Sequence, residues 1–314
     1  MSDLVSVIIA THNRSGHLKG TLESVLKQNT ENRFDFEVLV VDNNSTDATQ
    51  SVVESCRAAG GQRLKYLFES RQGKSFALNR GIEESQGNIL VMTDDDVVAD
   101  PNWLSALVEC FQKHSCDVIG GRVLPTFPAE TPAWVRDNPV QMAGVVVLLD
   151  YGQGVMPFAE SMNRFIGANF AFKREVFESC GVFRTDLGPG QGTVGEDTEF
   201  SYRVIRKNKN LYYCGQAVVW HPVDLKRLAL KNIVNWHMAL GRFNARCDIE
   251  EGKQYAAFAG VPQYLIRGIS GDILKFFVNI FSQKIFFNWA RNFFRKLGMI
   301  LEYRANYVRT RSEK

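Results

Sequence analysis

The first 125 residues alternate segments of helical periodicity with short apolar runs, which cover 5–10, 36–41, 64–68, 89–92 and 117–123. Short, nearly continuous runs of this kind are typical of strands that are covered on both faces. One helical face carries Leu18, Leu22, Val25 and Leu26. Further helices are expected over 75–85 and from Pro101, because a proline costs no hydrogen bond in a first turn. The alternation predicts an α/β fold with a mostly parallel sheet flanked by helices.

Acidic side chains follow two of these predicted strands directly. Asp42 ends the second strand, and Asp94-Asp95-Asp96 ends the fourth. In open parallel sheets, ligands bind beyond the carboxyl ends of the strands. On an extended backbone Asp94 and Asp96 point to one side and Asp95 to the other. Paired carboxylates there favour Mg²⁺ or Mn²⁺ shared with substrate phosphates, whereas the alternative is a solvated acidic turn.

Two glycine-containing stretches fail the tests for common phosphate-binding motifs. Gly73-Lys-Ser resembles the end of a P-loop, but position 68, where that motif needs a glycine, is Phe68. The run from Gly188 to Gly195 has Thr193 where a dinucleotide-binding fingerprint needs its third glycine. A P-loop and a dinucleotide cofactor are therefore not expected.

Composition excludes several classes of protein. The chain has 314 residues, 45% hydrophobic and 23% charged, with a net charge of +3, which excludes a disordered chain and a mini-protein. Its six cysteines contain no CxxC pair, so neither a disulfide framework nor a structural zinc site is expected. No secretory signal is visible at the start of the sequence. These features predict a reducing, cytoplasmic location.

Six short motifs occur along the chain in a defined order. They are Val7-Ile-Ile-Ala-Thr11-His-Asn-Arg14, Val40-Val-Asp42-Asn-Asn-Ser-Thr-Asp47, Gly73-Lys-Ser-Phe-Ala-Leu-Asn79-Arg-Gly81, Thr93-Asp-Asp-Asp96, Gly167-Ala-Asn169-Phe-Ala-Phe-Lys-Arg174 and Gly195-Glu-Asp197-Thr-Glu-Phe. Together they resemble family 2 glycosyltransferases, which have the Rossmann-like GT-A fold. The resemblance implies a catalytic domain over 1–225, with a nucleotide-binding half (1–123) and an acceptor half (124–225). Residues 226–314 then form a helical C-terminal extension.

The resemblance implies that a sugar moves from a nucleotide-diphosphate donor to an acceptor hydroxyl with inversion at the anomeric carbon. The leaving diphosphate gains charge, which a divalent cation, Mn²⁺ or Mg²⁺, offsets. Asp96 is expected to bind this ion, with Asp94 contacting the donor ribose or assisting the metal. His221 matches the position of a third ligand in some relatives, and its alternative is a strand-end histidine packed beside Trp220.

Inversion requires a base on the face opposite the leaving group. Asp197 matches the catalytic carboxylate of the family, and Glu196 beside it is expected to help position the acceptor. The structural alternative is an acidic start to a helix over 198–206, which the helix dipole favours. Both roles are compatible, because a base held at a helix start is expected to stay ionised.

Two further groups of residues complete the predicted site. The predicted donor contacts are Thr11, Asn13, Arg14, Asp42, Arg71, Lys74, Asp94 and Asp95. The predicted acceptor or sugar contacts are Gly167, Asn169, Glu196 and Trp134. Thr11 and Asp42 are expected to hold the base and ribose, with Asp42 accepting from a nucleobase N–H. For Arg71 and Lys74, a solvated surface position is an equal alternative.

The last 52 residues, from Gln263, are basic and aromatic. They carry ten Lys and Arg against three acidic residues, a net charge of +7. The positions Phe277, Ile280, Phe281 and Lys284 share one helical face. Charges interrupt every window long enough to span a bilayer, so we expect helices lying on an anionic membrane surface, at the inner face of the cell membrane. The alternative is that these aromatic side chains form a core.

Two other functions compete with this hypothesis. A sugar-phosphate nucleotidyltransferase has a similar sheet but carries a Gly-rich, Arg-containing loop after its first strand, where this chain has Thr11-His-Asn-Arg-Ser. A non-catalytic scaffold recruited to membranes would have no need of Asp94, Asp96 and Asp197. The expected partners are a nucleotide-diphospho-sugar donor and a saccharide or lipid-linked acceptor, and no nucleic acid. The sugar, the base and the acceptor stay open.

Overall fold

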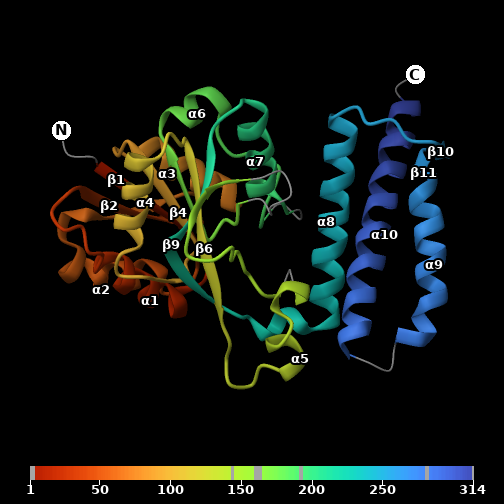
Figure 1. Cartoon of the computed structure of the whole chain (residues 1–314), viewed down its shortest axis with the longest axis horizontal. Helices are drawn as coiled ribbons and strands as arrows, with labels where there is room; N and C mark the ends of the chain where they lie inside the picture. The colour runs from red at the N-terminus through yellow and green to blue at the C-terminus, as the bar shows by residue number, and fades with distance from the viewer. Residues whose placement is uncertain (1–3, 143–144, 159–164, 191–193, 280–282, 313–314) are drawn as a thin grey trace. The chain divides into compact units, whose positions relative to one another are not determined.

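The computed structural model describes residues 4–142, 145–158, 165–190, 194–279 and 283–312 (Figure 1). The chain divides into two compact units. The first comprises Met1–Thr126, Val147–Gln191 and Glu196–Pro222. The second comprises Phe127–Val146, Gly192–Gly195 and Val223–Lys314. Part of the predicted acceptor half, Phe127–Val146, thus belongs to the second unit.

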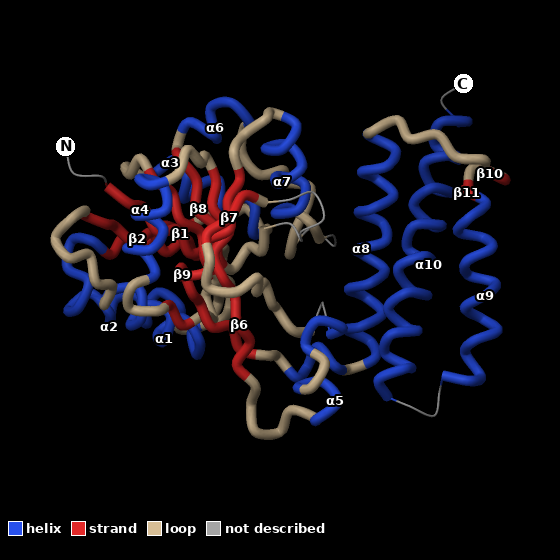
Figure 2. Tube along the Cα trace, in the orientation of Figure 1, coloured by secondary structure: helices blue, strands red, loops and turns tan. Residues whose placement is uncertain are grey.

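The first unit is a sheet with helices on both faces (Figure 2). Its strands are β1 (Leu4–Thr11), β2 (Asp35–Asp42), β3 (Leu64–Phe68), β4 (Ile89–Thr93), β5 (Val98–Ala99), β6 (Val118–Thr126), β7 (Val155–Pro157), β8 (Asn169–Lys173) and β9 (Leu211–Pro222). Its helices are α1 (Ser15–Leu26), α2 (Thr49–Gly60), α3 (Lys74–Glu84), α4 (Trp103–Lys113), α6 (Glu175–Cys180) and α7 (Glu196–Arg206), with a 3₁₀ turn at Gly61–Arg63. The order is β3-β2-β1-β4-β8-β6-β9-β5, and β7 pairs with β9. The predicted α/β class is confirmed.

Alternate side chains of the central strand enter opposite cores. Val5, Val7 and Ile9 of β1 join a cluster with apolar residues of α1, α2 and α4. Ile8 and Ala10 join a second cluster with residues of α3, α6 and α7. Apart from the buried Ser6 and the terminal Thr11, the strand is apolar because helices cover both of its faces.

Parallel pairing brings the predicted ligand-binding edge together. β3, β2, β1 and β4 run parallel, with Thr11 opposite Asp42 and Ile9 opposite Thr93. The carboxyl ends of these four strands therefore meet at one edge. At this edge the chain leaves β2 at Asp42 and leaves β4 immediately before Asp94.

The other half of the sheet is mixed. β8 inserts between β4 and β6 and is antiparallel to both. β6 runs parallel to β9, with a register shift between Gly121 and Arg122. A Cβ on Gly121 would lie 2.2 Å from the side chain of Asn169, so a glycine is needed where β8 and β6 pass. The predicted strand over 117–123 is present, but a strand from much later in the chain separates it from β4.

The second unit consists mainly of three long helices. They are α8 (Leu230–Glu250), α9 (Gln263–Asn279) and α10 (Gln283–Ser312), with short elements α5 (Ala133–Arg136), 3₁₀ turns Pro139–Met142 and Leu225–Leu228, and a hairpin of β10 (Ala257–Phe258) and β11 (Val261–Pro262). Figure 1 shows α8 and α9 on either side of α10. Glycines let α8 and α10 approach closely: a Cβ on Gly241 would lie 2.0 Å from the Arg295 carbonyl oxygen, and one on Gly298 would lie 2.2 Å from that of Met238.

Aromatic side chains near the start of α10 pack within this unit. Phe287 is 2% exposed, and the rings of Phe286, Trp289 and Phe293 follow one another with centroids 5.6 and 5.1 Å apart. In this segment the alternative that the aromatic residues form a core fits the packing. The face of Phe277, Ile280, Phe281 and Lys284 lies outside the described side chains. Among the described helices, none combines the length and apolarity needed to cross a bilayer.

Candidate active site

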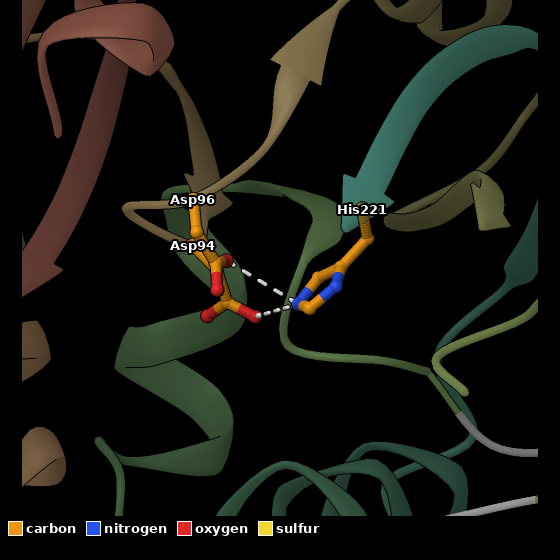
Figure 3. Close-up of side chains that lie close together, drawn as sticks. All are labelled: Asp94, Asp96 and His221. Atoms are coloured by element: carbon orange, nitrogen blue, oxygen red, sulfur yellow. Dashed lines mark ion pairs between the residues drawn. The ribbon is translucent and has the colours of Figure 1, made fainter. Parts of the chain in front are cut away.

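Two aspartates and a histidine converge beyond the carboxyl end of β4. His221 comes from the end of β9, and its Nε2 lies 3.3 Å from Asp96 Oδ1 and 3.9 Å from Asp94 Oδ2 (Figure 3). One potential ligand atom from each of the three residues lies within 4.8 Å of the others. Asp94 and Asp96 face the same way, as predicted, although Asp95 and Asp96 form a turn instead of continuing the strand.

The hydrogen bonds of these residues fit a cation. His221 Nδ1 lies 2.9 Å from the carbonyl oxygen of Pro222, which only accepts, so Nδ1 carries a proton. In the neutral ring Nε2 therefore presents a lone pair toward the two carboxylates. Asp96 Oδ1 is buried and has no hydrogen-bond partner among the described residues. Carboxylate oxygens with an imidazole nitrogen held by a backbone carbonyl form a donor set suited to a divalent metal.

An arginine lies on the other side of the acidic turn. Arg14, just beyond β1, forms an ion pair with Asp96 Oδ2 and lies 3.7 Å from Asp95 Oδ1. Asp95 is buried, and burial raises its pKa to about 6. Arg14 therefore offsets part of the negative charge of the triplet. From the sequence, Arg14 was assigned to the donor, and its contact with these aspartates was not predicted.

Lys74 links the acidic turn to the start of α7. Its Nζ lies 2.5 Å from Asp94 Oδ1. A Cβ on Gly167 would lie 3.3 Å from Lys74 Nζ and 3.6 Å from Asp197 Oδ2, and the Gly167 N–H donates to that oxygen at 3.1 Å. Although burial opposes the charge, Asp94 and then Glu196 hold the pKa of Lys74 above its ordinary value. Residues from three distant segments thus share one charged cluster.

Two carboxylates open α7. Burial, followed by the charge of Asp197, raises the pKa of Glu196 to about 7, and burial raises the pKa of Asp197 as well. Desolvation therefore opposes the expected effect of the helix start, which favours the ionised form of Asp197, and the ionised state of Asp197 stays a prediction. A carboxylate with a raised pKa is a stronger base when it is ionised.

The glycine-rich run before α7 closes against α3. Gly188 adopts φ +98°, and a Cβ there would lie 3.0 Å from Glu196 Cδ. Lys74 N–H donates to the Pro189 carbonyl oxygen at 3.1 Å, and a Cβ on Gly190 would lie 3.0 Å from Gly73 Cα. The glycines therefore allow the loop to approach both Glu196 and the start of α3.

The predicted base-binding residues lie at neighbouring strand ends. Thr11 and Asp42 are register partners, and both are buried. Asp42 accepts hydrogen bonds from the Ser45 N–H at 2.9 Å and from the Tyr66 hydroxyl at 2.8 Å. Asn13 has φ +52° and accepts from the Thr46 N–H at 2.7 Å, which ties the loops after β1 and β2 together.

The loop before α3 depends on an asparagine that the predicted site did not include. Asn43 Nδ2 donates to the Arg71 carbonyl oxygen, and Asn43 Oδ1 accepts from the Gly73 N–H, both at 2.7 Å. The signal was available, since Asn43 follows Asp42 at a strand end in the second motif. Arg71 itself pairs with Glu69 at 2.7 Å and lies over the Phe76 ring, 4.8 Å from its centroid.

Two residues that were predicted to contact the acceptor or sugar contact other protein groups in the structure. Asn169 is fully buried, and its amide donates to the carbonyl oxygens of Arg122 and Ala217 and accepts from Trp103. This side chain joins β8 to β6 and β9, and its contact with a sugar stays a prediction. Trp134 lies in the second unit, where its ring centroid is 5.9 Å from that of Phe287.

Comparison with known families agrees with this arrangement. The family described as "Glycosyl transferase family 2" matches residues 6–181, more than half of the chain. The chain belongs to glycosyltransferase family 2. The predicted resemblance is confirmed, whereas the individual roles assigned to site residues stay predictions.

Two proteins of Haloferax volcanii are among the curated relatives of this chain. Glycosyltransferase AglE is 28% identical over 69% of this chain and 66% of its own length. The glucosyl-dolichyl phosphate glucuronosyltransferase is 29% identical over 59% of this chain and 57% of its own length. The matches thus span about two thirds or less of these relatives.

Solved glycosyltransferase structures share the fold. The mannosyltransferase PcManGT of Pyrobaculum calidifontis, in complex with GDP-mannose and Mn²⁺, is 24% identical over 77% of this chain and 63% of that chain, with a TM-score of 0.56. TarS 1-349 of S. aureus, in complex with UDP, is 17% identical over 99% of this chain and 92% of that chain, also with a TM-score of 0.56. The GT-A fold predicted from the motifs is confirmed.

Proposed function

We propose that this chain is an inverting, metal-dependent glycosyltransferase that uses a nucleotide-diphospho-sugar donor. The acceptor is a hydroxyl of a saccharide or lipid-linked saccharide, in the synthesis of a surface glycan. Either Mn²⁺ or Mg²⁺ serves as the cation. The reaction takes place in the cytoplasm at the inner face of the membrane, a location with which the six free cysteines are compatible.

One observation carries the proposal: the candidate cation site and the candidate base flank the same lysine. Asp94, a member of the site with Asp96 and His221, lies 2.5 Å from Lys74 Nζ. Asp197 accepts a hydrogen bond from the N–H of Gly167, and Gly167 lies beside that lysine. Inversion needs charge stabilisation at the leaving group and a base for the acceptor close to one sugar carbon.

Each residue has a defined task in this reaction. Asp94, Asp96 and His221 would hold a divalent cation, which would stabilise the charge on the leaving diphosphate without proton transfer. Lys74 adds fixed positive charge beside Asp94. Asp197 accepts the proton of the attacking hydroxyl through a carboxylate oxygen, while the Gly167 N–H orients it. Burial strengthens these interactions because little water competes with them.

The relatives support the proposed substrates. The name of the second Haloferax relative describes a glucuronosyl transfer to a glucosyl-dolichyl phosphate, a lipid-linked saccharide. PcManGT was solved with GDP-mannose and Mn²⁺, and GalNAc-T7 was solved with UDP, GalNAc and Mn²⁺. These compounds belong to the donor and cation classes that we propose for this chain.

The experiment is a thermal-shift screen of nucleotide-diphospho-sugars with and without Mn²⁺, followed by transfer assays with the stabilising donor. A donor present at 100 times its dissociation constant is expected to stabilise the fold by about 2.7 kcal/mol. We expect Asp96→Asn to lose the Mn²⁺-dependent part of this shift. Asp35→Asn, at the opposite end of β2, is the matched control and is expected to keep it.

Three outcomes would contradict the proposal. The first is full stabilisation and turnover in Asp96→Asn. The second is release of pyrophosphate from a nucleoside triphosphate and a sugar phosphate, which indicates a nucleotidyltransferase. The third is donor binding with neither transfer nor hydrolysis under any condition, which indicates a scaffold.

A further inference from the structure

One end of the helical unit presents aromatic and basic side chains to solvent. This hairpin end comprises residues 251–267, which include the β10–β11 hairpin, and residues 301–312 of α10. At its tip Phe258 is 71% exposed, and Tyr264 is 48% exposed. One exposed aromatic side chain is common on a protein surface, whereas several exposed apolar side chains at one end of a unit indicate an interaction site.

The hairpin is held firmly against α10. Ala259 and Gly260 form its turn with φ values of +49° and +82°. Arg304 donates from Nη1 to the Ala259 carbonyl oxygen at 2.8 Å. A Cβ on Gly260 would lie 2.3 Å from Tyr307 Cβ, so the turn packs directly on the helix. Phe258 is therefore presented by a supported turn.

The hairpin end also carries four arginines, one on α9 and three on α10. Arg267, Arg304, Arg309 and Arg311 are exposed. The acidic residues of this end that form ion pairs use other cations: Glu251 pairs with Lys253, and Glu302 pairs with Arg246. None of the four arginines forms an ion pair within the described part of the chain. The hairpin end therefore carries uncompensated positive charge.

Apolar and basic residues share one face of α10. Leu301 and Val308 are 41% and 51% exposed. They alternate with Arg304 and Arg311 at spacings of three and four residues, so all four lie on one side of the helix. The guanidinium groups of both arginines lie over the Tyr307 ring, 5.6 and 5.2 Å from its centroid.

We propose that the hairpin end docks on an anionic phospholipid membrane, with Phe258 entering the interfacial region and the arginines contacting lipid phosphates. Aromatic and aliphatic residues interleaved with arginine are typical of surfaces lying in a bilayer interface. The inference concerns the second unit alone and does not require the proposed donor chemistry. It assigns the predicted membrane contact to this end, because Phe287 is buried.

Flotation of the full-length protein with vesicles tests the proposal. We expect binding to vesicles of phosphatidylcholine with phosphatidylglycerol, weak binding to phosphatidylcholine alone, and release by salt. The double variant Arg309→Gln with Arg311→Gln should bind roughly thirty-fold more weakly, since each arginine near an anionic surface contributes ~1 kcal/mol. Phe258→Ser should reduce binding roughly tenfold, whereas Phe258→Trp should retain it.

Matched control variants remove charge or apolar surface at other positions, so they test whether vesicle binding depends on the hairpin end itself. Lys19→Gln with Lys27→Gln removes two exposed positive charges, one from α1 and one from the residue that follows it. Val140→Ser removes an exposed apolar side chain elsewhere in the second unit. Both are expected to bind as the wild type does. Circular dichroism and thermal unfolding check that every variant is folded.

Several results would overturn the proposal. These are no binding of the wild type to anionic vesicles, equal binding to neutral and anionic vesicles, and wild-type binding by the double arginine variant. A dimer that Phe258→Ser dissociates would assign the surface to a second copy of the chain. An oligonucleotide complex lost in the arginine variant, with vesicle binding retained, would assign it to nucleic acid. Sugar transfer is measured separately, so its failure leaves this test unaffected.

Discussion

The candidate active site of the sheet unit and the hairpin end of the helical unit use charged side chains in opposite ways. In the candidate active site, acidic and basic groups pair with one another: Lys74 pairs with Asp94, and Arg14 pairs with Asp96. At the hairpin end, arginines such as Arg309 and Arg311 are exposed and form no ion pair with a described residue. Interlocked charges in a half-buried cluster suit chemistry, because each one controls the ionisation of its neighbours. Unpaired charges at a surface suit attraction to a partner of opposite charge.

The largest expected effect tests the candidate active site. Asp197→Asn removes the proposed base while preserving shape, and should lower kcat by about 10²–10⁴-fold, the usual contribution of general base catalysis. Donor binding in the thermal-shift assay should be unchanged. The control is Asp35→Asn, which is expected to keep wild-type kcat. Wild-type turnover in Asp197→Asn would remove this residue from the mechanism.

A second prediction tests the packing that supports the hairpin end. Gly241→Ala places a methyl group against the backbone of α10 and should destabilise the protein by about 1–3 kcal/mol, as overpacking does. Gly271→Ala is the control, because a Cβ there meets nothing within 4 Å; it should be neutral or stabilise by up to about 1 kcal/mol. Chemical denaturation measures both free energies of unfolding. Equal values would show that α8 and α10 do not pack as closely as described.

A third prediction concerns the arginine within the acidic cluster. Arg14→Met leaves Asp96 without its cationic partner, so Mn²⁺ should bind the nucleotide-free protein up to about fivefold more tightly, the range of ~1 kcal/mol for a partly exposed pair. Isothermal titration calorimetry measures the affinity. Arg57→Gln, which breaks the surface pair with Glu54, is the control and should leave it unchanged. Weaker Mn²⁺ binding in Arg14→Met would mean that Arg14 helps to build the site.

The smallest expected effect is a shift in pH dependence. The raised pKa of Asp197 means that kcat/KM should fall as the pH drops through this value, because the protonated form is not a base. Glu196 titrates beside it with a pKa of about 7. The charge of Asp197 is the second cause of this raised pKa after burial, so Asp197→Asn should lower the pKa of Glu196, which an NMR titration of the side-chain carboxyl carbon measures. An unchanged or higher pKa of Glu196 would show that the two carboxylates do not interact.

Local sequence was sufficient for the parallel half of the sheet. The runs that became β1, β2, β3 and β4 were found because burial on both faces leaves few polar positions in a strand. The common orientation of Asp94 and Asp96 was predicted from an extended backbone, whereas in the structure Asp95 and Asp96 lie in a turn. The motif order was also sufficient for the family and the fold, since it is a property of the sequence.

Only the tertiary structure shows which distant segments of the chain lie side by side. β8 lies between β4 and β6 although it follows both in the chain, and strand order leaves no trace in periodicity. The approach of His221 to Asp96, and of Lys74 to Asp94, depends on crossovers that join segments 125 and 20 residues apart. Likewise, the exposure of Phe258 and the burial of Phe287 distinguish two residues of one type. Hydrophobic patterning records that a residue favours burial, whereas the packing of distant segments determines whether it is buried.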